Sequence, residues 1–265
     1  MREKIRFKQP PEWMLIDKPV FIDKTGFFSK KDEVHEGLLN WLKAKIKKNK
    51  FIYRFLFYVV GPSFFLGKSP MEIFKILPAN ALVAEIGSGD RRLGKEVVNV
   101  DIYPWPEVDV VADAHDLPFA DNSLDGLVST WNIEHLIEPT KAVAEMLRVL
   151  RPDGVVFLST NFVYPYHSSP ADYYRWTKEG LLHLLSGFET LEIKMTIGPT
   201  SALLAVFQEW LAVLLSFGNR RLKDIWWLLI ILITFPLKIF DLLLIHYPSG
   251  EAIAGGFYFL GQKRK

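Results

Sequence analysis

The chain has 265 residues, of which 49% are hydrophobic and 23% charged, and its formal net charge is +2. Such a composition supports a sizeable core in one large or two small domains, and the near-neutral balance gives no reason to expect a nucleic-acid partner. Because the sequence contains no cysteine, disulfides and thiolate metal sites are excluded. We expect a cytoplasmic protein without a bound metal.

Residues 1–78 form a basic and aromatic N-terminal extension. The opening residues, MREKIRFKQPPEW, lack the apolar centre of a signal peptide. Between Gly37 and Met71 there is no aspartate or glutamate, whereas lysine and arginine are frequent. Within this stretch, Leu38–Val60 predicts one or two basic, strongly apolar helices, a composition that suits contact with anionic lipid headgroups.

Residues 79–196 alternate strand and helix patterns. We predict strands at residues 82–86, 97–101, 108–112, 124–129, 155–160 and 190–195, and helices at 138–150 and from Thr177 to Gly187. The segment GGFYFLGQK near the C-terminus predicts one more strand, so residues 251–265 belong to the same domain. This alternation indicates an α/β fold in which helices cover a mostly parallel sheet.

A glycine-rich turn follows the first predicted strand, and an aspartate ends the second. Gly87 and Gly89 permit unusual backbone angles and close approach of a ligand, and Asp101 can accept hydrogen bonds from a ribose diol. The alternative interpretation is a tight turn and a helix cap. A dinucleotide site is disfavoured, because Arg92 replaces the expected third glycine and Asp101 follows too soon.

Several motifs together resemble the class I S-adenosylmethionine-dependent methyltransferases, type 11 subgroup: VAEIGSGD, VNVDI, DAHDLPFADNSLDGLVS, WNIEHL and LRVLRPDGVVFLST. The resemblance implies a Rossmann-like, mostly parallel seven-stranded sheet with an antiparallel last strand. It also implies S-adenosylmethionine as cofactor. The residues that the resemblance places around the cofactor are Glu85, Gly87, Ser88 and Gly89 at the methionine part, Asp101 at the ribose, and Ile102, Asp113, Ala114 and His115 at the adenine, with residues 130–132 near the methionine moiety.

The connection between the first two predicted strands is unusually short. Only about seven residues remain for the crossover helix, whereas a complete connection needs at least about 10–12. We therefore expect a helix of one or two turns, and we expect the aromatic N-terminal helices to cover the sheet that a longer crossover helix would hide.

The methyl acceptor is expected to lie against the segments that follow strands four and five. Methyl transfer from a sulfonium needs positioning, and it needs a base only when the nucleophile carries a proton. His167 is the first candidate for that base and His135 the second, while Tyr166, Tyr173 and Arg175 are candidates for substrate contact. The alternatives are that His135 caps or packs a helix, that His167 is a surface residue, and that Arg175 pairs with Asp172 to fasten the loop.

Residues 197–250 form an apolar helical insert between strands six and seven. Two very apolar runs are joined by GNRRLKD, and the second run is long enough to span a bilayer. A hairpin that spans the membrane is disfavoured. Its basic joining segment would favour the cytoplasmic side, and the catalytic domain would then lie outside, away from its cofactor supply. The remaining alternatives are helices that lie in the membrane surface, which we favour, and a buried cap or a homodimer interface.

These patterns lead to one leading function and several alternatives. The leading hypothesis is a methyltransferase at the inner membrane face that acts on a lipid-linked or surface-glycan precursor. A soluble methyltransferase of small molecules is the close alternative. A membrane-associated scaffold without catalysis and a nicotinamide oxidoreductase are the others.

Overall fold

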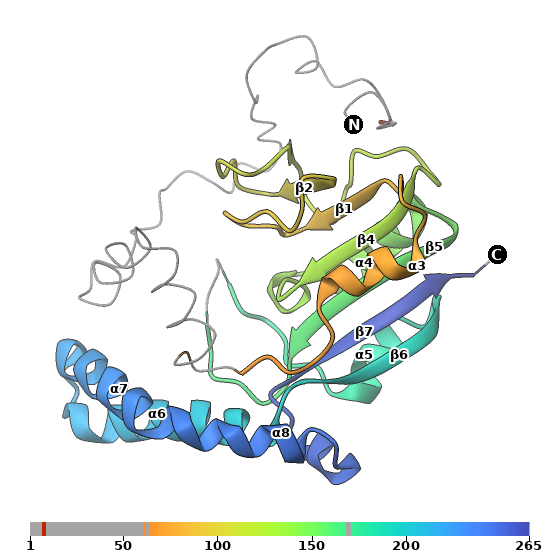
Figure 1. The fold of residues 1–265 in the computed structure, drawn as a ribbon. Coiled ribbons are helices and arrows are strands. Elements are labelled where there is room, and N and C mark those ends of the chain that lie inside the picture. The colour runs from red at the N-terminus through yellow and green to blue at the C-terminus, as the bar shows by residue number, and fades with distance from the viewer. Residues whose placement is uncertain (1–6, 9–60, 62–63, 168–170, 265) are drawn as a thin grey trace.

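The computed structural model describes residues 7–8, 61, 64–167 and 171–264 (Figure 1). Their core is a seven-stranded sheet with the order β3-β2-β1-β4-β5-β7-β6, in which only β7 runs antiparallel to its neighbours. This arrangement confirms the predicted Rossmann-like fold. The strands are β1 (Val83–Ile86), β2 (Val97–Asp101), β3 (Val110–Val111), β4 (Leu124–Thr130), β5 (Leu150–Asn161), β6 (Phe188–Ile197) and β7 (Gly256–Lys263).

The strand order reverses at β1. This strand pairs in parallel with β2 on one side and with β4 on the other, so that Glu85 is opposite Asn99 on β2 and Val128 on β4. In an open α/β sheet, the crevice beyond the carboxyl ends of the strands at such a reversal is the usual ligand site. The loops after β1, β2, β3 and β4 therefore meet at one edge of the sheet.

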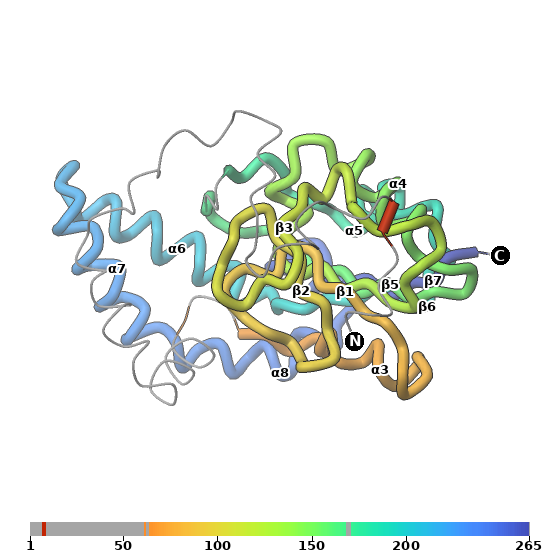
Figure 2. Tube along the Cα trace, turned by 90° about the horizontal axis from the view of Figure 1, so that it is seen from above, coloured from red at the N-terminus to blue at the C-terminus, as the bar shows by residue number. Residues whose placement is uncertain are grey.

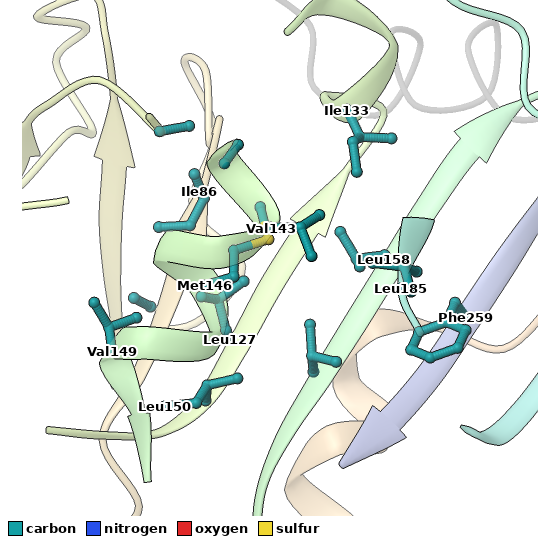
Figure 3. Packing of buried hydrophobic residues seen from close by; sticks show 14 of the residues in the cluster. Ile86, Leu127, Ile133, Val143, Met146, Val149, Leu150, Leu158, Leu185 and Phe259 are labelled. Atoms are coloured by element: carbon teal, nitrogen blue, oxygen red, sulfur yellow. The ribbon is translucent and has the colours of Figure 1, made fainter. Parts of the chain in front are cut away.

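Successive residues of the strands face opposite layers, and this alternation divides the core in two. Ala84 and Ile86 face the layer of α4 (Pro139–Val149) and α5 (Lys178–Leu184), and Val83 faces α3 (Ile73–Ile76). Figure 3 shows how side chains of α4, among them Val143 and Met146, pack over the first layer's strand residues. Buried apolar area of this kind supplies most of the stabilisation.

The connection between β1 and β2 differs from the prediction. Residues 87–96 are all described and contain no helix, so the expected turn or two is wrong. Polar contacts hold this loop instead. Arg92 donates two hydrogen bonds to the carboxylate of Asp109, at 3.0 and 3.1 Å, and Asn99 donates to the carbonyls of Arg91 and Glu107.

A segment just before β1 packs against one face of the sheet. Ile73 of α3, preceded by the short helix η4 (Pro70–Glu72), is fully buried and contacts a cluster that includes Val83, Val128 and Val155. Phe65 pairs with the Ile197 backbone of β6, and its ring lies 5.3 Å from that of Trp131. The helices predicted at residues 38–60 lie outside the described residues.

The insert between β6 and β7 is a helical hairpin of α6 (Pro199–Ser216) and α7 (Arg220–Thr234). It continues through η6 (Phe235–Phe240), α8 (Asp241–Leu244) and η7 (Pro248–Ile253) back to the sheet. Figures 1 and 2 show the hairpin extending away from the α/β layers to one side. By length and composition alone, Pro199–Ser216 and Arg220–Leu244 are long and apolar enough to cross a membrane. Of the apolar 18-residue window in each, 44% and 28% are buried, respectively.

Candidate functional site

Two glycines shape the loop that follows β1. Both have positive φ, 72° at Gly87 and 60° at Gly89, which is a conformation that other residues rarely adopt. The Gly87 amide donates to the Val100 carbonyl at 2.8 Å, and a Cβ on Gly87 would lie 2.3 Å from the side chain of Asn132. A Cβ on Gly89 would meet nothing within 4 Å. The loop is therefore closed toward β4 at Gly87 and open at Gly89.

The carboxylate of Asp101 lies against this open position. One oxygen accepts from the Gly89 amide at 2.8 Å and the other from the Tyr103 amide at 2.9 Å. Burial raises the pKa of Asp101, and these backbone hydrogen bonds oppose the rise. Because a carboxylate has about four acceptor positions, it can still receive the two hydroxyls of a ribose. The next residue, Ile102, leaves 37% of its surface exposed for contact with a flat ring.

Asp113 follows β3 on the same edge. Its Oδ1 accepts from the His115 amide at 2.9 Å and lies 2.6 Å from His115 Nδ1, and the bond to His115 lowers the pKa of this carboxyl. The other ring nitrogen of His115 accepts from the Glu138 amide at 3.2 Å. Both nitrogens are thus engaged, so His115 orients Asp113 and joins this loop to the start of α4. Ala114 is buried beside them.

Glu85 is the last residue but one of β1 and is fully buried. Its Oε1 pairs with Arg91 at 2.5 Å, and Arg91 also donates to the hydroxyl of Thr130 on β4. Burial raises the pKa of Glu85, and the charge of Arg91 opposes this. Among the described residues Glu85 Oε2 has no hydrogen-bond partner, so an acceptor oxygen lies unused at the strand reversal.

All the residues predicted around the cofactor therefore lie at one edge of the sheet. Asp101 is paired with Val111 of β3, which brings the loop carrying Asp113 beside the Gly89 position. Gly89 leaves open space at this edge. The two carboxylates supply hydrogen-bond acceptors, and the exposed Ile102 supplies an apolar surface. Such an arrangement fits a nucleoside with a charged tail.

The segments after β4 and β5 bring the two catalytic candidates together. His135 ends the short helix η5 (Ile133–His135), and its ring centroid lies 4.9 Å from that of His167 in the loop after β5. His135 Nδ1 bonds to the carbonyl of Ala171. Burial lowers the pKa of His167 from its ordinary value, and the nearby charge of His135 acts in the same direction.

Asp172 and Arg175 fasten the loop that carries His167. Asp172 is almost fully buried, and its carboxylate accepts from Arg175 at 2.5 and 2.6 Å and from the His167 amide at 2.8 Å. Arg175 also donates to the carbonyls of Tyr164, Pro165 and Tyr174. The pairing expected as the alternative is therefore present, and Arg175 is committed to the loop. Tyr166 and Tyr173 are exposed, at 73% and 48%, and their substrate roles stay predictions.

One residue of this region was missed by sequence reasoning. Glu134 is fully buried, accepting from Thr160 Oγ1 at 3.0 Å and from Asn161 Nδ2 at 2.7 Å. Burial raises the pKa of its carboxyl. Glu134 lies within the motif WNIEHL, but a glutamate in a short polar turn gives no sign of burial until the position of β5 is known.

Comparisons with known proteins point to a methyltransferase domain. Residues 88–158 match the family model described as a methyltransferase domain. Over 50 residues the chain is 48% identical to a demethylmenaquinone methyltransferase of Paenarthrobacter aurescens, covering 18% of this chain and 20% of that protein. Over 123 residues it is 30% identical to a ubiquinone/menaquinone biosynthesis C-methyltransferase of Geotalea daltonii, covering 45% and 51%. The chain thus spans from a fifth to about half of the length of these two curated relatives.

Among solved structures, the phosphoethanolamine N-methyltransferase 2 of Haemonchus contortus, in complex with S-adenosyl-L-methionine, aligns with a TM-score of 0.46 at 16% identity. The alignment covers 82% of this chain and 57% of that one. The family match supports a methyltransferase domain over residues 88–158, in line with the resemblance noted in the sequence.

Proposed function

Since residues 88–158 match a methyltransferase domain, we propose that this protein transfers a methyl group from S-adenosylmethionine to an acceptor held beyond β4 and β5. One observation carries the proposal. Open backbone at Gly89, the Asp101 carboxylate and the Asp113 carboxylate lie at the ends of three neighbouring strands, beside the strand reversal. The methionine part, the ribose and the adenine of S-adenosylmethionine follow one another in the same order.

Different residues around the loop contact different parts of the cofactor. Asp101 accepts from the ribose hydroxyls, and Asp113 accepts from the adenine amino group while Ile102 packs on the ring. The unused Oε2 of Glu85 suits the ammonium group of the methionine part, since a buried carboxylate oxygen without a donor is costly to leave unpaired. Gly87, Ser88 and Gly89 keep the backbone close to the sulfonium.

The chemical step needs little from the protein beyond alignment. The acceptor atom attacks the methyl carbon in line with the sulfonium, the carbon–sulfur bond breaks, and a neutral thioether leaves. When the acceptor carries a proton, His167 takes it, with His135 as the neighbouring alternative. His167 suits this role because a lowered pKa keeps its imidazole neutral at physiological pH.

We also propose that the acceptor is borne by a membrane and that the protein works at its inner face. The hairpin exposes large apolar side chains, for example Trp210 at 57%, Phe217 at 90% and Ile233 at 76%. Exposed apolar surface on this scale is typical of partner or membrane contact. Two relatives carry names that refer to menaquinone, a lipid-soluble kind of molecule, which supports an apolar acceptor alongside the lipid-linked precursor inferred from the sequence.

Calorimetry with S-adenosylhomocysteine and with NAD tests the cofactor assignment. We expect binding of the first and none of the second. Asp101→Ala should weaken binding by about 10-fold or more, because a charge-assisted hydrogen bond contributes about 1.5–3 kcal/mol. Glu189→Ala, which removes an exposed carboxylate from β6, is the control and should bind normally. Unchanged affinity of Asp101→Ala would show that the ribose lies elsewhere.

A further inference from the structure

Three groups with metal-ligand chemistry converge at the carboxyl ends of β4 and β5. Glu134 and His135 follow β4, and His167 lies in the loop after β5. One ligand atom from each of the three, a carboxylate oxygen and two imidazole nitrogens, lies within 4.8 Å of the other two. We propose that this cluster binds a divalent metal ion of the zinc type.

The two imidazoles are held in orientations that suit ligation. His135 Nδ1 bonds to the carbonyl of Ala171, which leaves the Nε2 lone pair as the ligand. For His167, the Asp172 carboxylate lies 3.4 Å from Nδ1. Metal-bound histidines almost always direct their second nitrogen to a carbonyl or a carboxylate, because that contact fixes the tautomer and the ring. His135 has the carbonyl partner, whereas His167 Nδ1 makes no hydrogen bond among the described residues and has the Asp172 carboxylate nearby as the group it could turn to.

The position of Asn161 shows which way His167 faces. Its Nδ2 donates to Glu134 Oε1 at 2.7 Å and lies 3.5 Å from His167 Nε2. Nε2 of His167 is therefore on the side of Glu134, as a shared ion requires. Thr160 and Asn161 orient the two carboxylate oxygens of Glu134, and each oxygen keeps a further lone pair.

Charge gives an independent argument. Glu134 is fully buried, and none of the ion pairs within the described part of the chain joins it to a lysine or arginine. The charge of Arg175 reaches Glu134 only from beyond ion-pair distance, and a buried carboxylate without a direct cationic partner is costly. A dication between Glu134 and the two imidazoles would offset that cost.

The ligand set selects the ion. Two imidazoles and one carboxylate suit zinc and its neighbours, whereas magnesium and calcium prefer oxygen ligands. Three protein ligands also leave a coordination position open, as in catalytic zinc sites. On the proposed function, this position faces the acceptor. Because one Nε2 lone pair cannot serve two purposes, His167 is a base in the metal-free chain and a ligand in the metal-bound chain.

Equilibrium dialysis of the chelator-treated full chain against Zn²⁺ or Co²⁺, with metal analysis of the protein, tests the site. We expect one ion per chain, a visible absorption band with Co²⁺, and no such saturation with Mg²⁺. Glu134→Gln and His135→Gln should each weaken binding by more than about 10-fold. His183→Gln, which removes an exposed histidine of α5, is the matched control and should bind as the wild type does.

The same samples are titrated with S-adenosylhomocysteine. Variants that keep that affinity are folded, so their loss of metal would support the cluster. Wild-type protein that binds no Zn²⁺, or binding that falls only in His183→Gln, would overturn the proposal. Since the cofactor titration does not depend on the ion, a failed metal site and a failed cofactor assignment give different results.

Discussion

Gly87 and Gly89 share a backbone conformation but have opposite surroundings. At Gly87 the side chain of Asn132 occupies the place of a Cβ, so this glycine is required by packing between β1 and β4. At Gly89 the corresponding space is open beside Asp101. The sequence motif does not distinguish the two, whereas the structure gives the first a packing role and leaves the second beside open space.

Alanine at each position should therefore have different effects. Both substitutions carry the cost of a left-handed backbone, about 1–2 kcal/mol. Gly87→Ala adds a clash with Asn132 and should lower the urea midpoint much more than Gly89→Ala does. Gly89→Ala should stay folded yet bind S-adenosylhomocysteine at least about 10-fold more weakly. Equal loss of stability in the two variants, with unchanged binding in Gly89→Ala, would contradict this assignment.

Asp172 makes part of the stability depend on pH. Burial raises its pKa, but the hydrogen bonds from Arg175 and from the His167 amide outweigh this and lower the pKa to about 2, against 3.8 for a free aspartate. Because the folded value is the lower one, the ionised carboxylate stabilises the fold above about pH 4. That contribution is lost as the pH falls from about 4 to about 2.

We expect Asp172→Asn to be less stable than the wild type at neutral pH, with the difference shrinking toward pH 2. The difference between 3.8 and about 2, at about 1.4 kcal/mol per pH unit, corresponds to about 2–3 kcal/mol. Urea unfolding at a series of pH values measures it. Asp121→Asn is the control, because that carboxylate is 70% exposed and its pair with Arg148 should contribute little. A constant difference across pH would count against the role of Asp172.

At the scale of elements, the start of the hairpin is capped by a residue that is distant in the sequence. The position before α6 is Gly198, which has no side chain to cap the helix. The buried carboxylate of Asp241, from α8, accepts instead from the amides of Thr200 and Ser201 at 2.7 and 2.8 Å. A Cβ on Gly198 would lie 2.4 Å from that carboxylate. The two ends of the insert are thereby joined.

Asp241→Ala should destabilise the start of α6 by about 1–3 kcal/mol, because two amides lose a charged acceptor and one of them is buried. Hydrogen exchange should become faster in the first turn of α6 while the exchange of β4 and β5 stays slow. Asp224→Ala, which removes an aspartate of α7, should leave both unchanged. Equal protection of α6 in the two variants would show that Asp241 is not its cap.

The strands and the two helices on one face could be predicted, because buried positions recur with the period of each element. The connection after β1 could not. Its expected helix is replaced by the contacts of Arg92 and Asn99 with the loop before β3, which no local pattern reveals. The cofactor residues followed from a motif at strand ends, whereas Glu134 became visible only when β5 brought Thr160 and Asn161 to it.

At the scale of the molecule, the described part of the chain combines an α/β sheet with an apolar helical hairpin that projects from it. Exposed apolar side chains continue from the hairpin through η6 and α8. They include Leu203, Trp210, Val213, Leu214, Phe217, Leu232, Ile233, Ile239, Phe240, Leu242 and Leu243. A membrane surface is the proposed occupant of this region, and a second copy of the chain is the alternative.

Flotation with anionic liposomes distinguishes the two. The wild type should float, and the triple variant Trp210→Ser, Phe217→Ser, Ile233→Ser should stay at the bottom, because each change removes an exposed apolar side chain from the lipid contact. The triple control Met71→Ser, Ile137→Ser, Leu191→Ser alters exposed residues elsewhere and should float. Detergent-free wild type that sediments as a dimer and ignores liposomes would favour the second copy.

The insert leaves and rejoins the sheet at a single cross-strand pair. Ile197 of β6 is the register partner of Gly256 of β7, and the Gly255 amide donates to the Ile197 carbonyl at 2.9 Å. Because β6 and β7 are adjacent antiparallel strands, the whole insert is topologically the connection of one β-hairpin. A chain with a tight turn there would keep the same edge of the sheet at the ends of β1 to β4, so the insert could vary in length without changing that edge.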